Sequence, residues 1–255
     1  MSYVDPLQSF RLDGKRALVT GSGRGIGLAL AQALAAVGAH VTLAARTESE
    51  ISAAAQALKK ADLKADAIVI DITDIVQTRA IIAETGPYDI LVNNAGINRP
   101  GPLADMTTED FDAVMNVNVR AAYFISQAVV GGLKQARRGG SIINISSQMG
   151  HVGSSGRTVY CASKHALEGM TKAMAVELGP DNIRVNTICP TFIETPLTEP
   201  YLQDEAFKSW VLSKIKLGRI GQVKDIIGGV IFLASDASSM ITGSAVKIDG
   251  GWTAD

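Results

Sequence analysis

Tyr160 and Lys164 are four residues apart in Val159–Thr171, a stretch whose apolar spacing predicts a helix. The phenol and the ammonium would therefore share one helix face. A free tyrosine titrates near pH ~10, and lowering that pKa to ~7 takes roughly 4 kcal/mol of differential stabilisation. A lysine alone rarely supplies that much, whereas an oxidised nicotinamide nearby adds a second cation. The pair is thus a candidate acid–base device, provided that the chain holds a dinucleotide.

A glycine-rich loop near the start of the chain could hold one. It consists of Thr20, Gly21, Ser22, Gly23, Arg24, Gly25, Ile26 and Gly27. A short apolar strand, Arg16–Thr20, precedes it, and an Ala/Leu-rich helical run follows. This order lets the backbone approach a pyrophosphate and directs the first N–H groups of the helix at its charge. The spacing is not GxGxxG, and a glycine cluster alone fits an ordinary turn about equally well.

Further motifs along the chain resemble those of the short-chain dehydrogenase/reductase family. Its TGxxxGIG pattern matches Thr20–Gly27, its NNAG pattern Asn93–Gly96 and its YxxxK pattern Tyr160–Lys164. The catalytic serine of the family falls on Ser147, and its helix asparagine on Asn118. The matches occur in the family's order and span nearly the whole chain, which is identified as a member on that basis.

Short β-branched runs alternate with longer helical patterns. The runs that predict strands are Ala17–Thr20, Val41–Ala44, Ala67–Ile70, Ile90–Asn93, Ser141–Ile145, Arg184–Ile188 and Ala245–Ile248. Such alternation predicts an α/β fold with right-handed crossovers and a parallel sheet covered on both faces. We expect a single-domain, doubly wound Rossmann-type sheet of about seven strands over residues 1–255, with residues 191–221 as a substrate lid.

Composition agrees with one domain. The chain has 255 residues, of which 47% are hydrophobic, and a formal charge of −1, without a linker or a basic patch for nucleic acid. The uncharged stretch Ile26–Ala45 predicts a buried helix, a turn and a buried strand rather than a membrane span, because Gly38 and polar residues interrupt it. The start of the chain does not resemble a secretion signal, so a cytoplasmic location is expected.

Neither the cysteines nor the histidines have metal-ligand spacing. Cys161 and Cys189 are expected to be reduced thiols. His40, His151 and His165 favour surface or core roles, so no metal site is expected.

Charge favours NADP over NAD. In NAD-binding Rossmann folds an acid near the end of the second strand bonds the ribose 2′-hydroxyl and would repel a 2′-phosphate. Here that place is taken by Ala45, followed by Arg46, and Arg24 lies in the glycine loop. Two guanidinium groups could pair with the phosphate, and NAD remains the alternative if both are merely solvated.

The resemblance implies further cofactor contacts, with Asp71 at the adenine and with Ile193 and Thr195 at the carboxamide and pyrophosphate. The expected set is Gly21, Ser22, Gly23, Arg24, Gly25, Ile26, Gly27, Arg46, Asp71, Ile72, Asn94, Ala95, Gly96, Tyr160, Lys164, Pro190, Ile193 and Thr195. The family often has Pro-Gly where this chain has Pro190-Thr191, which would alter the backbone path beside the nicotinamide.

The resemblance also implies reversible hydride transfer between nicotinamide and a carbonyl carbon, with Tyr160 moving the proton and Ser147 bonding the oxygen. Lys164 would lower the tyrosine pKa and bond the nicotinamide ribose, and Asn118 would anchor a water that connects Lys164 to solvent. Each residue has a structural alternative: a core tyrosine, a helix-cap serine, a surface lysine and a buried asparagine bonded to a neighbouring strand.

The substrate is less defined. A polar rim of Gln148, His151, Arg99 and Arg157 favours a sugar, polyol or sugar acid. Other candidate pocket residues are Met149, Val152, Phe192, Leu197 and Trp210. The alternatives are a 3-oxoacyl-carrier-protein reductase, a dinucleotide-sensing protein without chemistry, and a dehydratase or epimerase of the longer related branch.

Two expected helices carry apolar residues on more than one face, in Ala121–Ile125 and Ala166–Met170. In the family these helices pack against symmetry mates, and the last strand, here Ala245–Ile248, pairs across another twofold axis. A homotetramer, or a homodimer, is therefore expected.

Overall fold

The strands form one parallel sheet in the order β3-β2-β1-β4-β5-β6-β7. The computed structural model describes residues 5–196 and 198–254, and the seven strands are counted among them. Their bounds are β1 Arg16–Thr20, β2 His40–Ala45, β3 Ala65–Val69, β4 Ile90–Asn93, β5 Gly140–Ile145, β6 Ile183–Pro190 and β7 Ala245–Ile248. The sheet grows in one direction from β1 to β3 and in the other from β4 to β7. The loops after β1 and β4 therefore flank the crevice where such sheets bind ligands.

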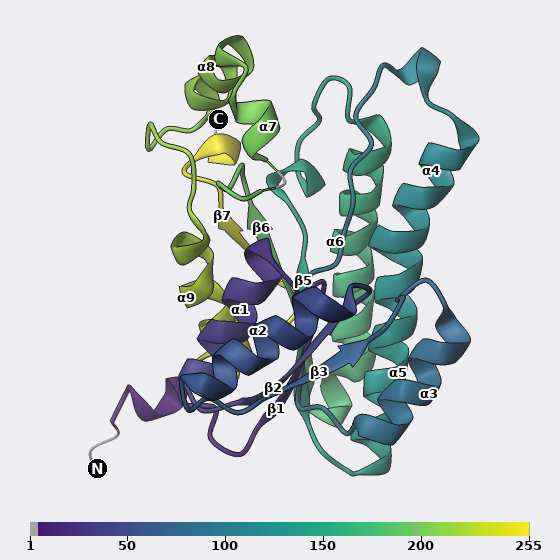
Figure 1. The fold of residues 1–255 in the computed structure, drawn as a ribbon, viewed down its shortest axis with the longest axis vertical. Helices are drawn as coiled ribbons and strands as arrows, with labels where there is room; N and C mark the ends of the chain where they lie inside the picture. Colours follow the sequence, from purple (N-terminus) through teal and green to yellow (C-terminus); the bar gives the residue numbers. More distant parts are fainter. Residues whose placement is uncertain (1–4, 197, 255) are drawn as a thin grey trace.

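Helices cover both faces of the sheet (Figure 1). Their bounds are α1 Gly25–Ala36, α2 Glu48–Lys60, α3 Ile75–Thr85, α4 Thr108–Met115, α5 Ala122–Gln135, α6 Thr158–Leu178, α7 Glu199–Leu202, α8 Glu205–Lys214 and α9 Val223–Ala234. One apolar cluster joins α1, α2 and α9 to the sheet, and a second joins α3, α5 and α6 to it. The predicted doubly wound fold is confirmed.

Element bounds differ from the sequence prediction mainly at the edge of the sheet. The third strand begins at Ala65 and ends at Val69, whereas the pattern predicted Ala67–Ile70. This strand pairs only with β2 and leaves most of its residues exposed or half-buried, so its apolar pattern is weak. The uncharged stretch Ile26–Ala45 forms α1 and β2 as expected. None of the described helices is both long and apolar enough to cross a membrane.

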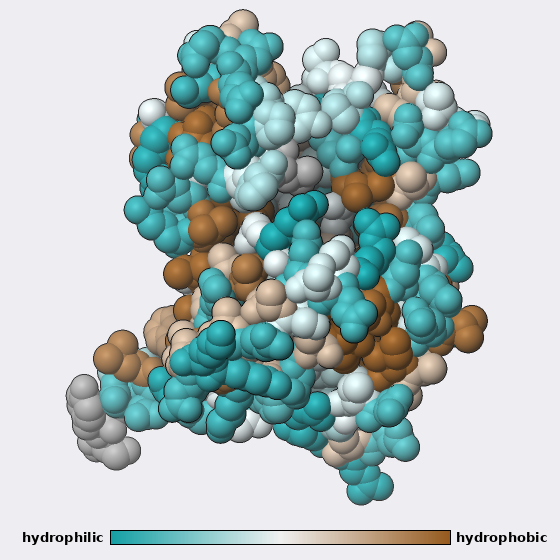
Figure 2. Space-filling model, in the orientation of Figure 1, coloured by the Kyte–Doolittle hydropathy of each residue, from teal (hydrophilic) through white to brown (hydrophobic). Residues whose placement is uncertain are grey.

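The segment predicted to be a lid carries α7 and α8, which stand beyond the carboxyl ends of the central strands (Figure 1). Aromatic rings hold this segment to the C-terminal turn: Trp252 lies 5.8 Å from Phe192 and 5.5 Å from Trp210, between ring centres. Trp210 thus packs against other rings. Leu197, a predicted pocket residue, lies outside the described residues. Figure 2 shows a notch between the lid helices and the α4 region.

Candidate active site

Tyr160, Lys164 and Ser147 converge where β5 ends and α6 begins. Ser147 caps a short turn, Gln148–Gly150, by accepting a bond from Met149 N–H, and donates its hydroxyl to Gln148 Oε1 at 2.7 Å. Lys164 is buried one turn after Tyr160, and its Nζ donates to Ile145 O at 2.9 Å. The sequence spacing correctly placed the phenol and the ammonium on one face.

Burial dominates the electrostatics of this pair. It raises the pKa of Tyr160 to about 12, although a hydrogen bond with Ser147 and the charge of Arg157 act in the opposite direction. It also lowers the pKa of Lys164 to about 8, against the charges of Cys189 and Glu168. Lys164 is not among the groups that act on the Tyr160 pKa in the chain alone, so the expected lowering by lysine and nicotinamide together stays a prediction.

Asn118 lies in a π-helical turn, Asn116–Ala121, between α4 and α5. Its Nδ2 donates to Ile97 O at 2.9 Å and its Oδ1 accepts from Ile97 N–H at 2.8 Å, so the side chain clamps the backbone after β4. Its Nδ2 also donates to Ser163 Oγ at 3.1 Å. The partners lie in the loop after β4 and on α6 and not in a neighbouring strand, and the water expected at Asn118 stays a prediction.

The glycine loop folds tightly because two of its glycines need their missing side chain. Gly21 has φ +63°, and a Cβ there would lie 2.9 Å from Ala95 Cα. A Cβ on Gly27 would lie 2.3 Å from Gly21 O. No side chain among the described residues caps the start of α1, and its first turn contains no acid. The N–H groups of Gly25, Ile26 and Gly27 thus begin an uncapped helix, which is a ready anion site.

Other predicted cofactor residues brace this loop. Ser22 is fully buried, donates its hydroxyl to Val19 O and accepts from Ala44 N–H, so its side chain faces the sheet. Asn94 donates its side chain to Thr20 O at 2.9 Å and to Gly21 O at 3.1 Å. The Thr20 hydroxyl accepts from the Asn94 and Ala95 N–H groups, a support that the motif did not reveal. Ser22, Asn94 and Ala95 therefore hold the glycine loop in position through these hydrogen bonds.

Arg46 is exposed just after the end of β2. Two hydrogen bonds from Thr73 hold the pKa of Asp71, which follows β3, below its ordinary value, and the charge of Arg46 lowers it further. Arg24 pairs with Glu50 at 3.5 Å. Glu50 was missed by sequence reasoning, yet its Oε2 would lie 3.2 Å from a Cβ on Gly23. It thus places an acid beside the proposed phosphate contacts, because α2 turns it back toward the glycine loop.

The remaining predicted contacts lie along the ends of β3, β4 and β6. Ile72 and Ile193 are buried, and Pro190 ends β6. A Cβ on Gly96 would lie 3.3 Å from Asn118 Oδ1 and 3.7 Å from Lys164 Nζ, so these groups are adjacent. Thr195 bonds Thr198 through both its N–H and its hydroxyl.

Two buried acceptors follow the same strand ends. Asn98 Oδ1 and Thr191 Oγ1 find no hydrogen-bond partner within the part of the chain that is described. Thr191 is also where the family's usual glycine is replaced. Such unsatisfied atoms are costly and mark positions where a ligand could bond.

The four residues of the predicted polar rim lie in different surroundings. Arg99 is exposed and pairs with Asp110 at 3.5 Å. Arg157 is only 9% exposed, and its guanidinium carbon lies 5.5 Å from the centre of the Tyr201 ring on α7. Gln148 is buried on Ser147, and His151 contacts Cys189. Only Arg157 thus combines burial with proximity to Tyr160 and the lid segment.

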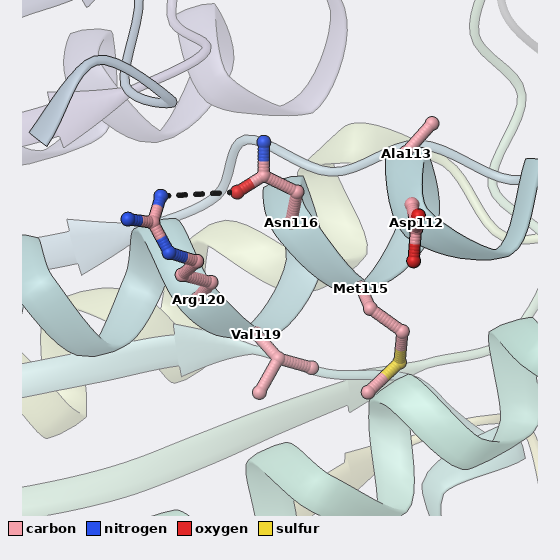
Figure 3. A pocket seen from close by; sticks show the side chains of 6 residues that line it. All are labelled: Asp112, Ala113, Met115, Asn116, Val119 and Arg120. Carbon is pink, nitrogen blue, oxygen red and sulfur yellow. Dashed lines mark hydrogen bonds between the residues drawn. The ribbon is translucent and has the colours of Figure 1, made fainter. Parts of the chain in front are cut away.

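A separate surface hollow lies along α4 and the π-helical turn (Figure 3). Its lining residues are Asp112, Ala113, Met115, Asn116, Val119 and Arg120. None of the predicted catalytic residues lines it. Its mixture of methionine, valine and alanine with charged groups is more typical of a contact surface than of a catalytic pocket.

Comparisons with known proteins match this geometry. A family model described as "Enoyl-(Acyl carrier protein) reductase" matches residues 21–253. The chain is 40% identical over 244 residues to an L-xylulose reductase of Bos taurus, covering 96% of this chain and 98% of that protein. It is 40% identical over 257 residues to gluconate 5-dehydrogenase of Gluconobacter oxydans, covering 99% of both.

Among solved structures, a gluconate 5-dehydrogenase from Burkholderia cenocepacia J2315 in complex with NADP and tartrate superposes with a TM-score of 0.95. The identity is 38%, and the match covers 98% of this chain and 100% of that chain.

Proposed function

The chain belongs to the short-chain dehydrogenase/reductase family, and from that premise we propose that it interconverts a secondary alcohol and a ketone on a sugar, polyol or sugar acid, with NADP as redox partner. It is an NAD(P)-dependent oxidoreductase acting on CH–OH groups. Relatives whose names specify L-xylulose and gluconate, and a neighbour that binds NADP and tartrate, support the substrate class and the cofactor.

The residues present fit a dinucleotide. The uncapped start of α1 and the glycine backbone would take the pyrophosphate, and the exposed Arg46 and Arg24 the 2′-phosphate. The unpartnered Thr191 Oγ1 is a bonding group at the nicotinamide end. When bound, the nicotinamide supplies hydride chemistry at the substrate carbon.

The chain's own groups handle the proton. Tyr160 O–H, whose pKa burial raises, gives its proton to the substrate oxygen in reduction, and in oxidation the Tyr160 phenolate takes the proton of the substrate alcohol. Ser147 turns the hydroxyl that it now gives to Gln148 toward the same oxygen and holds it. Lys164 lends positive charge to the phenol, and Asn118 is a positioning residue that fixes the loop after β4.

Arg157 is the single observation that carries the choice of a sugar acid. Arg157 is largely buried as a residue, and a charge in such a place is stabilised by an anionic partner. Among the described residues its guanidinium has neither a hydrogen bond nor an ion pair, only the stacking on Tyr201 and its field at Tyr160, and its nitrogens are not among the fully buried atoms that lack a partner, so a ligand can reach them. A substrate carboxylate between the lid and the phenol would supply the missing anion.

The test compares an aldonic acid with the alditol of the same configuration, measured by nicotinamide absorbance with NADP. Arg157→Ala should raise KM for the acid about tenfold or more, since a charge-assisted bond is worth ~1.5–3 kcal/mol, and leave the alditol unchanged. Arg99→Ala is the matched control, because that arginine is exposed and already paired. Equal losses for both substrates would remove Arg157 from carboxylate binding, and no turnover of any sugar or polyol would overturn the substrate class itself.

A 3-oxoacyl-carrier-protein reductase is the second candidate, supported by 41% identity over 245 residues to a protein of that name from Thermotoga maritima. A short 3-oxoacyl thioester in the same assay distinguishes it, since that substrate needs no carboxylate partner at Arg157. Turnover of the thioester far above that of sugars would favour this candidate.

We also propose that the protein is a cytoplasmic homotetramer. Phe111 and Tyr123 are 45% and 44% exposed on α4 and α5, the two helices joined by the π-helical turn whose Asn116, Val119 and Arg120 line the hollow. The strand β7 ends the sheet, so one of its edges has no neighbouring strand within the described residues. Both features favour burial against further copies of the chain.

A further inference from the structure

Three side chains from distant parts of the chain, His151, Glu168 and Cys189, come together at α6, the helix that also carries Tyr160 and Lys164. His151 follows the turn after β5, Glu168 lies on α6 and Cys189 on β6. Cys189 Sγ lies 3.3 Å from both His151 Nε2 and Glu168 Oε1, and the latter two atoms are 3.8 Å apart. The proposed hydride and proton transfers do not use this cluster.

The three distances match one face of a metal tetrahedron. Zinc binds sulfur at about 2.3 Å and nitrogen or oxygen at about 2.0–2.2 Å, which places tetrahedral ligand atoms about 3.3–3.6 Å apart. The two separations from sulfur, 3.3 Å each, fall at the short end of this range, and the nitrogen–oxygen separation of 3.8 Å lies just above it, so small side-chain shifts would close the site around an ion. Thiolate, imidazole and carboxylate together suit a borderline-soft divalent ion such as Zn²⁺ or Co²⁺.

Neighbouring residues position the three candidate ligand side chains. Thr187 Oγ1 donates to Glu168 Oε2 at 3.0 Å, which fixes the carboxylate and leaves Oε1 facing the thiol. Cys189 is fully buried and Glu168 6% exposed, whereas the His151 side chain is 23% exposed and offers an entry path. Gly150 permits this approach, because a Cβ there would lie 2.9 Å from Ser146 Oγ and 3.2 Å from Glu168 Cγ.

Ser146 points independently to a ligand. It is 3% exposed, and its hydroxyl has no hydrogen-bond partner among the described residues. Its hydroxyl lies beside the cluster, since the same Cβ position on Gly150 is close to both Ser146 Oγ and Glu168 Cγ. A thiolate held by a metal would give this orphaned hydroxyl an acceptor.

We propose that His151, Glu168 and Cys189 form a binding site for a divalent transition metal of the zinc type, with a fourth position left for water. On binding, the Cys189 S–H bond breaks, the sulfur–metal bond forms and the proton passes to solvent. The bound cation would lie close to the Lys164 ammonium, because Glu168 follows Lys164 by one turn of α6, so occupancy is expected to inhibit turnover by repelling that charge.

Cobalt is the probe, because a thiolate–Co²⁺ bond gives a charge-transfer band in the near ultraviolet. Titration of the cofactor-free protein should give this band with one equivalent per chain and release of a proton. Cys189→Ser should abolish the band, and His151→Gln should weaken binding at least tenfold. His151→Gln guards against a misfolded Cys189 variant, since that histidine is half-buried in a turn.

The matched controls are the other buried cysteine and a histidine outside the cluster, both on α6. Cys161→Ser and His165→Gln should retain the band, because His165 bonds Cys161 O and neither belongs to the cluster. Absence of the band in the wild-type protein, or its persistence in Cys189→Ser, would overturn the site. Excess Zn²⁺ should displace the cobalt and lower turnover in the wild type but not in His151→Gln.

Discussion

The Lys164 ammonium lies 5.5 Å from the centre of the Tyr160 ring and gives its hydrogen bond to the Ile145 carbonyl. The cation therefore acts on the phenol through space and through the aromatic face, not by bonding its oxygen. The charged form of each group is disfavoured, because burial raises the pKa of Tyr160 and lowers that of Lys164. A cationic ligand beside the phenol would ease its ionisation, which links cofactor binding to the proton step.

Removing the phenol hydroxyl should separate binding from chemistry. Tyr160→Phe is expected to reduce kcat by roughly two or more orders of magnitude, because the proton donor is lost while little volume changes. Cofactor affinity, measured by fluorescence titration, should stay nearly intact. Tyr123→Phe, on an exposed face, is the control and should keep wild-type turnover. Normal turnover in Tyr160→Phe would show that another group moves the proton.

Burial of Lys164 should cost stability in a pH-dependent way. Its pKa is about 8 in the folded protein and 10.5 unperturbed, so the unfolded chain binds more protons between these pH values. Wild-type stability should therefore gain a contribution as pH rises from 8 to 10.5 and lack it below 8. Lys164→Met should be about 1–3 kcal/mol more stable at pH 7, after allowing for the lost bond to Ile145 O. Urea unfolding at pH 7 and pH 10 checks this, and an unchanged difference between the two would contradict it.

Arg46 should bind the 2′-phosphate that distinguishes NADP from NAD. Arg46→Ala is expected to weaken NADP by about 1–3 kcal/mol and leave NAD almost untouched, since a charge-assisted bond is lost. Calorimetric titration with both cofactors measures the difference. Equal losses would mean that Arg46 only shapes the start of α2.

Glu50 should oppose the same phosphate. Glu50→Gln removes an acid beside Gly23 and releases Arg24 from its ion pair, so NADP should bind more tightly by about 0.5–1 kcal/mol. Glu48→Gln is the matched control, an exposed acid in the same first helical turn. If the Glu50 variant binds NADP more weakly, that carboxylate instead holds Arg24 in its binding position.

Assembly should be visible in solution. Sedimentation at micromolar protein should give a species near four times 26.8 kDa. Val119→Asp, in the hollow of Figure 3, should dissociate it, while Val76→Asp, on the exposed side of α3, should not. A fully active wild-type monomer would rule the assembly out.

The sequence by itself determined the fold and the shared helix face of Tyr160 and Lys164, because both follow from local periodicity. Alternation of β-branched runs with helices can form a parallel sheet only through right-handed crossovers. A spacing of four in a helix places Tyr160 and Lys164 together whatever surrounds them. The glycine loop could be predicted for the same reason, because the adjoining backbone leaves no room for a side chain at Gly21 or Gly27.

Tertiary structure alone decided the roles that depend on packing. The pKa of Tyr160 follows from its desolvation by the surrounding chain, and no spacing records desolvation. Glu50 faces the glycine loop only because α2 folds back onto it. His151, Glu168 and Cys189 carry no metal-ligand spacing because their segments meet only when β6 joins β5 and α6 packs over both. Long-range contacts of this kind arise from the burial of whole surfaces, which local sequence does not encode.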